Sequence, residues 1–426
     1  MDVAILNVIF QPTKAIRKEF RLFAGRVKTM DKCLDALAIP GSSMAIYGAR
    51  GVGKSSLAYQ LYQVIGGQTE VAEALGIHGL SLGSPCSVIW HECKSNEEID
   101  IDGLLLHVLR PAVNEHAFSS VFPKIYKDEA FLDHVQTTHG IDLRTLTWQR
   151  GPNSGKSVFS PEVRSELKPA GLVGPLFRDV VDYVKIQHDE PDVVLFVDEF
   201  DRLDDRSGLA TLLKSLRNFR FVFMGVANDL KELITDHESV VRKLIGSSVE
   251  LPGLNEDEIR TIFKLATRAS KNSVQFEDAF VDRVIHHAYG FPWVAQHLGF
   301  HACRLAYKEQ SEKETLVVEE RHFRPAMRIV LEFLQNSHHL QVESFADKTT
   351  EKEILSLLCS NAIGFSRDEL RGKLADHLKR WASDSVDRLK ERGVIAKRDG
   401  KYWFADPTRR ILYEFYLEQQ KDQEKP

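Results

Sequence analysis

The strongest constraint on the fold is a glycine-rich turn between an apolar run and an amphipathic pattern, in the stretch SSMAIYGARGVGKSSLAYQLYQVI (42–65). The apolar run predicts a short buried strand, and the pattern after the turn predicts a helix. Gly48, Gly51 and Gly53 allow the backbone to fold tightly, so that its N–H groups point at an anion. The N-terminus of the helix adds the positive end of its dipole. The sequence therefore predicts a phosphate-binding loop between a strand and a helix.

Two side chains of this loop carry the expected chemistry. Lys54 can reach the β- and γ-phosphates of a nucleotide, and the hydroxyl of Ser55 can ligate Mg²⁺. The alternative is a structural turn that matches the pattern by chance. We expect the whole loop to hold the nucleotide, through Gly48, Ala49, Arg50, Gly51, Val52, Gly53, Lys54, Ser55 and Ser56. A second Gly-Lys-Ser, in GPNSGKS (151–157), has the wrong spacing and no apolar strand before it, so it predicts a polar surface loop.

An acidic partner for this loop follows an unbroken apolar run at 193–197. Such a run predicts a strand of a parallel sheet that is buried on both faces, and ligands collect at the carboxyl ends of such strands. Asp198, directly after the run, can hold the shell of a Mg²⁺ ion, and Glu199 can polarise an attacking water. The alternative is an ordinary strand with acidic residues at its exit.

Further strands are predicted at 219–229, 87–92 and 247–251, which gives about five parallel strands. The strand at 219–229 ends at Asn228, whose side chain can contact the γ-phosphate or the water; the alternative is that Asn228 caps the next helix. Arg242 lies late on a helix before the last strand. An arginine at this place reaches the γ-phosphate of a neighbouring subunit in ring-forming ATPases. The alternative is a surface arginine.

The composition limits the class of protein. The chain has 426 residues, 43% of them hydrophobic and 27% charged, which indicates a globular protein of two or three domains. Its net charge of −5 means that any binding of nucleic acid must come from a local basic patch. The five scattered cysteines, and the lack of a signal peptide or membrane span, lead us to expect a cytoplasmic protein with reduced thiols and no membrane partner.

The last part of the chain, from about residue 347, predicts three helices and a hairpin, the order found in a winged helix. Ser366 is the expected N-cap of one helix, with Glu369 three residues later, and Asp399-Gly400 is the expected hairpin turn. Between 377 and 410 there are ten Lys or Arg and five Asp or Glu, a local basic excess. The candidate phosphate contacts with DNA are Lys379, Arg380, Arg388, Lys397, Arg398 and Lys401.

An alternative for this region is a lid or a docking module for another protein, and Asp384 and Asp387 on the candidate recognition helix count against tight insertion into a groove. Two adjacent histidine pairs, His286-His287 and His338-His339, lack metal-ligand spacing, because neighbours on a helix point in different directions. We interpret these histidines as surface or interface residues.

Taken together, the segments at 23–37, 48–56, 195–203, 223–229, 239–244 and 290–299 resemble the AAA+ and STAND ATPases, in the initiator-like prokaryotic branch related to origin-recognition ATPases. The resemblance covers about residues 10–308. It implies that Phe23 and Arg26 lie near the adenine, that Asn228 is sensor 1 and that Arg242 is an arginine finger. The stretch 290–297 departs from the family because it has no sensor-2 arginine, which puts fast hydrolysis in doubt and fits a slow switch.

The expected fold is α/β: a parallel five-stranded P-loop (ASCE) sheet at 1–252 with an insertion near 95–185, a helical lid at 253–345, and an α+β winged-helix domain with a tail at 346–426. The expected function is an ATP- and Mg²⁺-binding ATPase that assembles as a homo-oligomer and contacts DNA. One alternative is an ATP-gated regulator of a partner nuclease or other effector, as in prokaryotic antiviral defence or transposition. A second alternative is a binding module whose ATP is structural.

Overall fold

The fold was derived from a computed structural model of the chain. The structure describes residues 4–39, 41–77, 86–94, 100–112, 114–146, 148–150, 157–159, 173–188, 193–216, 219–227, 230–234, 244, 246–310, 314–338, 345–361, 364–398, 400–405 and 407–423. The chain divides into two compact units. The nucleotide-loop unit comprises Ala15–Gly48 and Gly53–Pro252, and the C-terminal unit comprises Met1–Lys14, Ala49–Val52 and Gly253–Pro426. The boundary after residue 252 is where we expected the lid to begin, whereas the first 14 residues join the C-terminal unit.

The nucleotide-loop unit contains the five-stranded parallel sheet that the sequence predicts, in the order β2-β5-β6-β1-β7. Its strands are β1 (Met44–Gly48), β2 (Ser87–Glu92), β5 (Val193–Asp198), β6 (Phe219–Val226) and β7 (Val249–Glu250). The strand before the glycine-rich loop, β1, and the strand before Asp198, β5, are therefore separated by β6. The expected fold class, a parallel α/β sheet of the P-loop type, is confirmed.

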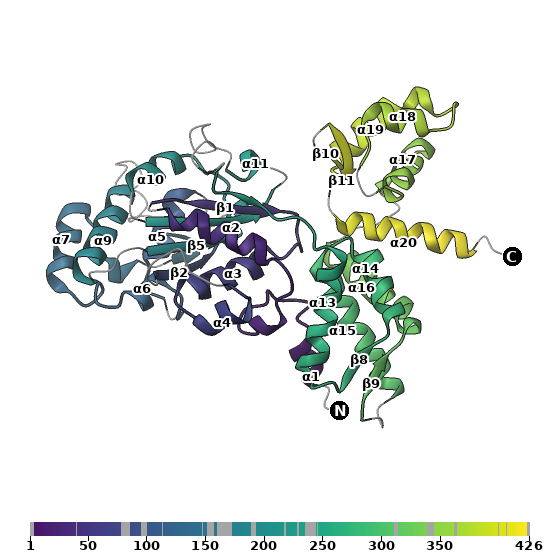
Figure 1. Cartoon of the computed structure of the whole chain (residues 1–426). Helices are drawn as coiled ribbons and strands as arrows, with labels where there is room; N and C mark the ends of the chain where they lie inside the picture. Colours follow the sequence, from purple (N-terminus) through teal and green to yellow (C-terminus); the bar gives the residue numbers. More distant parts are fainter. Residues whose placement is uncertain are drawn as a thin grey trace. The chain divides into compact units, whose positions relative to one another are not determined.

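Helices cover both faces of this sheet, as Figure 1 shows for α2 and α3 on one side. The helical elements of the unit are η1 (Phe20–Leu22), α2 (Val27–Ala38), α3 (Lys54–Ile65), α4 (Thr69–Ala74), α5 (Ile101–Leu109), α6 (Phe118–Val121), α7 (Glu129–His139), η2 (Leu143–Thr145), α9 (Val173–His188), η3 (Phe200–Arg202), α10 (Leu209–Ser215) and α11 (Leu230–Ile234). A small antiparallel hairpin pairs β3 (Trp148–Arg150) with β4 (Ser157–Phe159). Residues 151–156, which include most of the second Gly-Lys-Ser stretch, lie outside the described residues.

Strand β5 has two buried faces because its side chains alternate between two layers of helices. Leu195 and Val197 belong to the core formed with α5 and α9. Phe196, between them, points to the other face, where its ring stacks on Trp90 and contacts Tyr62 of α3. This alternation has a period of two, so Asp198 lies on the same face as Phe196, under α3.

The stretch near 95–185, where an insertion was expected, has a helix of the core at each of its two ends. Leu104 and Leu105 of α5, and Leu176 and Phe177 of α9, are buried in the core beneath the sheet. These helices therefore belong to the layer that covers the sheet, since a crossover between the parallel strands β2 and β5 needs a helix. The additional elements between them are α6, α7, η2 and the β3–β4 hairpin.

The first part of the C-terminal unit is mainly helical, and its identity as a lid stays a prediction. Its elements up to residue 338 are α1 (Ala4–Ile9), α13 (Glu256–Ala269), β8 (Val274–Phe276), α14 (Asp278–Ala288), α15 (Pro292–Glu309), β9 (Leu316–Val318), η4 (Glu320–His322) and α16 (Phe323–His338). A capping box of Asn255 and Glu258 starts α13. Helix α1 lies against α13 and α15, and Gly299 allows this because a side chain there would collide with the ring of Phe10.

The last elements follow the predicted order of three helices and a hairpin. They are α17 (Thr349–Cys359), α18 (Arg367–Lys373), η6 (Lys379–Trp381), α19 (Ala382–Glu391), β10 (Ile395–Arg398), β11 (Lys401–Phe404) and a long final helix, α20 (Pro407–Gln423). The predicted capping box of Ser366 and Glu369 is present. Strands β10 and β11 pair with Arg398 opposite Lys401, and a bridge from Phe365 to Tyr402 adds a third short strand segment. The identity of this region as a winged helix stays a prediction.

Within the part of the chain that the structure describes, none of the helices combines the length and apolar character that crossing a lipid bilayer requires.

Candidate active site

The glycine-rich loop has the backbone that the sequence predicts. Gly51 (φ 78°) and Gly53 (φ 98°) adopt the left-handed conformation, which other residues rarely adopt. Gly53 is the N-cap of α3 and supplies no side-chain cap, and the N-terminus of a helix is a position that suits an anion. Lys54 is the first residue of α3, only 8% exposed, and its Nζ donates a hydrogen bond to the Gly48 carbonyl at 3.0 Å. The loop thus holds its own lysine inside the turn.

The loop and the acidic strand meet in one hydrogen bond. The Ser55 hydroxyl donates to Asp198 Oδ1 at 3.1 Å, and the Glu199 N–H donates to the same oxygen at 3.0 Å. Asp198 is only 5% exposed, and this burial raises its pKa above the ordinary value. A hydroxyl and a carboxylate oxygen are the hard ligands that Mg²⁺ prefers. Ser55 and Asp198 therefore fit the metal-side role that the sequence predicts.

Glu199 follows in an unusual conformation. Its backbone is left-handed, with φ 56° and ψ 37°, which for a residue other than glycine costs about 1–3 kcal/mol. The carboxylate is half-exposed and forms an ion pair with Arg202 one turn later. Burial, together with the charges of Asp198 and Glu92, raises its pKa despite the opposing charge of Arg202. This carboxylate lies next to the metal-side residue, where a water-activating base would be needed.

A clamp that the sequence analysis missed joins the segment after β5 to the end of β6. Asp201 Oδ1 accepts a hydrogen bond from the Val226 N–H at 2.9 Å. Gly225 permits this approach, because a Cβ at that position would come within 2.7 Å of the same oxygen. Asn228, the candidate sensor, and Arg242, the candidate arginine finger, lie outside the described residues. Their roles stay predictions.

The two residues that the resemblance places near the adenine precede α2. Phe23 is half-buried after η1, and Arg26 is buried with a left-handed backbone (φ 67°) as the N-cap residue of α2. Their contact with a nucleotide stays a prediction. Where the family carries a sensor-2 arginine, α15 begins with Pro292 and Trp293. Within the C-terminal unit, which includes residues 49–52, the Trp293 N–H donates to the Gly51 carbonyl at 3.4 Å.

A further carboxylate, Glu92, ends β2 directly opposite Asp198. The sequence analysis placed the strand at the correct residues but gave no role to its last residue. The signal that could have identified it is the polar residue at the carboxyl end of a strand predicted to be parallel to β5. Its partner is Arg17, whose Nη2 lies 3.6 Å from Glu92 Oε2.

The candidate DNA contacts differ in their availability. Arg388 is engaged with Glu351, which is only 1% exposed: Arg388 Nε donates to Glu351 Oε1 at 2.7 Å. Lys379 forms an ion pair with Asp376 at 2.6 Å. Arg380 lies over the ring of Trp381, which is 49% exposed. Arg388 thus joins α19 to α17 through Glu351, and its contact with a DNA phosphate stays a prediction.

The remaining candidates lie on the hairpin. Lys397 is exposed on β10, with its Nζ over the ring of Tyr402, and Lys401 is partly exposed on β11. Arg398 is the last residue of β10. These three residues thus belong to one short hairpin, as the sequence predicts.

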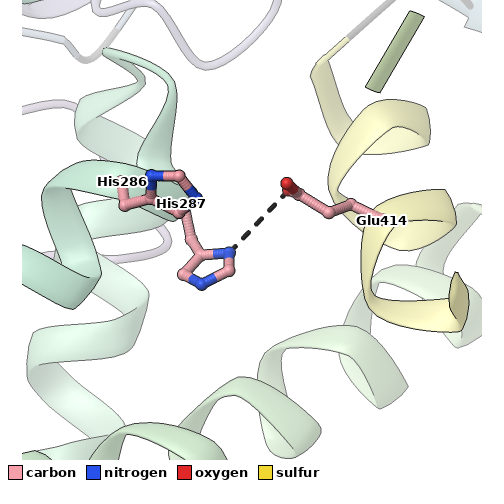
Figure 2. Close-up of side chains that lie close together, drawn as sticks. All are labelled: His286, His287 and Glu414. Atoms are coloured by element: carbon pink, nitrogen blue, oxygen red, sulfur yellow. Dashed lines mark ion pairs between the residues drawn. The ribbon is translucent and has the colours of Figure 1, made fainter. Parts of the chain in front are cut away.

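The histidine pair at the end of α14 meets a glutamate from the final helix (Figure 2). One potential metal-ligand atom from each of His286, His287 and Glu414 lies within 4.8 Å of the other two. His287 Nδ1 is 3.8 Å from Glu414 Oε2. The same oxygen accepts a hydrogen bond from the Tyr289 hydroxyl, and Arg410 lies over the Tyr289 ring. The cluster is thus a polar link between α14 and α20. His286 is exposed, whereas His287 is buried in this link between two helices, so the two residues correspond to the surface and the interface alternatives respectively.

Comparisons with known proteins extend these observations. No protein-family model and no curated protein matches the sequence. Among solved structures, the Walker-type ATPase PABY2304 of Pyrococcus abyssi is 16% identical, with a TM-score of 0.51 over 95% of this chain and 99% of that chain. The ORC2 protein of Aeropyrum pernix is 15% identical, with a TM-score of 0.47 over 98% of each chain.

Only the first of these two likenesses is close enough to support an argument, and at this identity it concerns the fold alone. The chain has the fold of a Walker-type P-loop ATPase.

Proposed function

We propose that this chain is a Mg²⁺-dependent ATPase of the AAA+/STAND type that converts ATP and water to ADP and phosphate slowly and acts as a switch. The observation that carries the proposal is the hydrogen bond between Ser55 of the glycine-rich loop and Asp198 at the end of β5. It brings a hydroxyl ligand, a buried carboxylate and the N-terminus of α3 together around one position. These groups match the parts that phosphoryl transfer requires.

Each residue would have a separate task. Lys54 and the N–H groups at the start of α3 bind the phosphates, while Ser55 and Asp198 hold the metal ion. When bound, Mg²⁺ would neutralise negative charge on the phosphates. Glu199 accepts a proton from the attacking water. The water oxygen forms a bond to the γ-phosphorus as the bond from that phosphorus to the bridging oxygen of ADP breaks. For this role the Glu199 carboxylate would have to leave its ion pair with Arg202.

The proposed ATPase also assembles as a homo-oligomer and binds DNA. Arg242 would reach the γ-phosphate of a neighbouring subunit in a homo-oligomer, which makes hydrolysis depend on assembly. The hairpin residues Lys397, Arg398 and Lys401 would contact DNA phosphates without reading base sequence.

A second candidate function is an ATP-gated regulator that docks on an effector protein. It is favoured by the ion pairs in the C-terminal region: Arg388 with Glu351, Arg367 with Asp387 and Lys379 with Asp376. These pairs reduce the positive charge available to phosphate. The exposed ring of Trp381 beside them is typical of a protein-binding surface.

Calorimetry of ATP binding and a phosphate-release assay test the proposal, each with Mg²⁺ and with EDTA. We expect Mg²⁺-dependent binding and slow release of phosphate by the wild type. Lys54→Ala should weaken ATP binding at least about tenfold, because it removes a charge-assisted contact. Lys32→Ala, an exposed residue of α2, is the control that should bind normally. Unchanged ATP affinity in Lys54→Ala, or no binding by the wild type, would contradict the proposal.

A further inference from the structure

The segment before η1, residues 15–19, is fastened along α3, and we call it the N-terminal strap. The Ile16 N–H donates to the Ser56 hydroxyl at 3.0 Å, directly beside Ser55 of the candidate metal site. One turn further along α3, the Gln60 side chain donates to the Ile16 carbonyl at 2.9 Å, and Gln63 donates to the Arg17 carbonyl at 3.0 Å. Three side chains of one helix thus fix the backbone of Arg17 relative to the phosphate-binding loop.

The side chain of Arg17 extends from the strap toward the sheet. Its guanidinium lies 5.6 Å from the ring centroid of Tyr59 on α3 and 5.6 Å from that of Trp90 on β2. Nη2 is 3.6 Å from Glu92 Oε2. The guanidinium thus lies between the two rings and the Glu92 carboxylate, so Arg17 is directed toward the carboxyl edge of the sheet.

That edge is where the metal-side carboxylate lies. Glu92 and Asp198 are register partners on adjacent parallel strands, so their side chains leave the sheet on the same face, about 4.8 Å apart at the backbone. Trp90 and Phe196 lie two residues earlier on the two strands and stack on each other, which confirms the shared face. The charge of Arg17 also acts on Asp198, where it partly offsets the rise in pKa that burial causes.

We propose that Arg17 leaves Glu92 when ATP binds and contacts the γ-phosphate from within the same subunit. This inference rests on the proposed ATPase function and adds to it a residue that reads the third phosphate. A bound γ-phosphate carries more negative charge than a carboxylate and would lie above Ser55 and Asp198, one strand away from Glu92. The guanidinium is suited to both partners, because its planar fork of N–H donors pairs with carboxylate and with phosphate oxygens.

The exchange has two consequences for the site. In the presence of ATP, Arg17 supplies a positive charge where negative charge develops on the transferred phosphoryl group, in a chain whose lid helix has no arginine at 290–297. After hydrolysis and phosphate release, Glu92 recaptures the guanidinium. ADP therefore gains nothing from Arg17, and the strap provides a means of distinguishing ATP from ADP.

The test compares ATP and ADP affinities by calorimetry, and turnover by phosphate release, for the full chain. Arg17→Met keeps an unbranched side chain over the two rings but removes the charge. We expect it to weaken ATP binding about tenfold or more and to leave ADP binding within about twofold, with a lower kcat. Arg17→Lys should restore part of the preference for ATP. Arg21→Ala is the control, because Arg21 is on the adjacent turn and forms an exposed ion pair with Glu70 at 2.7 Å.

Glu92→Gln provides the opposite perturbation. It removes the resting partner of Arg17, so the preference for ATP over ADP should rise. An Arg17→Met protein with the wild-type ratio of ATP to ADP affinity and wild-type kcat would overturn the inference while leaving the ATPase proposal intact. Equal losses of ATP and ADP affinity would also overturn it, since they would mean that Arg17 only supports the fold of the strap. A wild type that binds neither nucleotide would instead contradict the ATPase proposal itself.

Discussion

The Ser55 hydroxyl donates a hydrogen bond to Asp198 Oδ1 at 3.1 Å, although 143 positions separate the two residues in the chain. This contact is the point at which the glycine-rich loop and the acidic end of β5 form one site. Burial disfavours the charged form of the Asp198 carboxyl, and a nearby cation would favour it. The geometry leads to predictions about the residues that act next to this pair and about those that lie far from it.

Glu199→Gln should bind ATP with near wild-type affinity and lose hydrolysis by about 100-fold or more, because general-base catalysis contributes about 10²–10⁴-fold. The amide keeps the size of the side chain but cannot accept a proton from water. The measurement is a single-turnover assay with bound ATP, alongside calorimetry. Glu73→Gln, on the exposed side of α4, is the matched control. Hydrolysis at the wild-type rate by Glu199→Gln would assign the base to another residue.

Arg242→Ala should lower turnover only at protein concentrations at which subunits associate. The reason is that an arginine finger acts on the nucleotide of the neighbour, where it contributes orders of magnitude in rate. Turnover is measured against protein concentration for the variant and the wild type, with association followed by sedimentation. An activity per subunit identical to that of the wild type at every concentration would make Arg242 a surface residue. Arg17 variants, by contrast, should be defective at all concentrations, since Arg17 acts within one subunit.

Replacement of Lys397, Arg398 and Lys401 by Ala should weaken DNA binding equally across sequences. The slope of log affinity against log salt should become shallower by about 0.9 for each DNA phosphate that the variant no longer neutralises. ATP binding should be unchanged. The measurement is a salt titration of DNA affinity with ATP present.

The control for the hairpin variant replaces three other exposed lysines, namely Lys231, Lys264 and Lys308. It changes the net charge by the same amount without touching the hairpin. Equal slopes and affinities for the hairpin variant and the wild type would favour the effector-docking function over DNA contact.

Glu351→Gln should destabilise the C-terminal region by about 2–3 kcal/mol, because it leaves Arg388 and Arg392 without the buried carboxylate that both contact. Burial raises the pKa of Glu351, but hydrogen bonds from Arg388 and the charge of Arg392 outweigh this effect and leave the pKa below its ordinary value. The stabilisation is therefore complete above the pKa of an unfolded glutamate and is lost as the pH falls through the lower folded value.

Urea unfolding as a function of pH measures this contribution. Glu353→Gln, an exposed neighbour on the same helix, is the control and should change the free energy of unfolding by less than about 0.5 kcal/mol. A Glu351→Gln protein as stable as the control would mean that the two arginines find water or other partners at no cost.

The parts of the site that could be predicted from sequence are those that depend on neighbouring residues in the chain. The loop before α3 needs glycines at the positions where its backbone is left-handed. The apolar run of β5 ends at Asp198, the residue that accepts the hydrogen bond from Ser55. The residues that could not be predicted depend on strand order. Glu92 acquires its place only because β2 pairs with β5, and Arg17 acquires its place through bonds to α3.

The same reason explains the contacts that the sequence analysis did not predict. Arg388 has the charge and position of a phosphate contact, but a buried glutamate on another helix, Glu351, engages it. The stretch near 95–185 was too long for a simple crossover, and composition alone did not separate α5 and α9, which cover the sheet, from the elements added between them. In both cases the position of the residue or helix depends on a contact with a part of the chain that is distant in sequence.

The strand order has a consequence for how the protein is made. Strand β1 is synthesised early, but its partners in the sheet are β6 and β7, with Met44 opposite Val222 and Ile46 opposite Val249. Until residue 226 has left the ribosome, the nascent chain has the glycine-rich loop and β1 but lacks β6 and β7, the two strands that pair with β1. Such long-range parallel pairing is slow to form. If the chain binds ATP as proposed, its nucleotide site is completed late in biogenesis, and ATP should protect the finished protein against unfolding more than it speeds its folding.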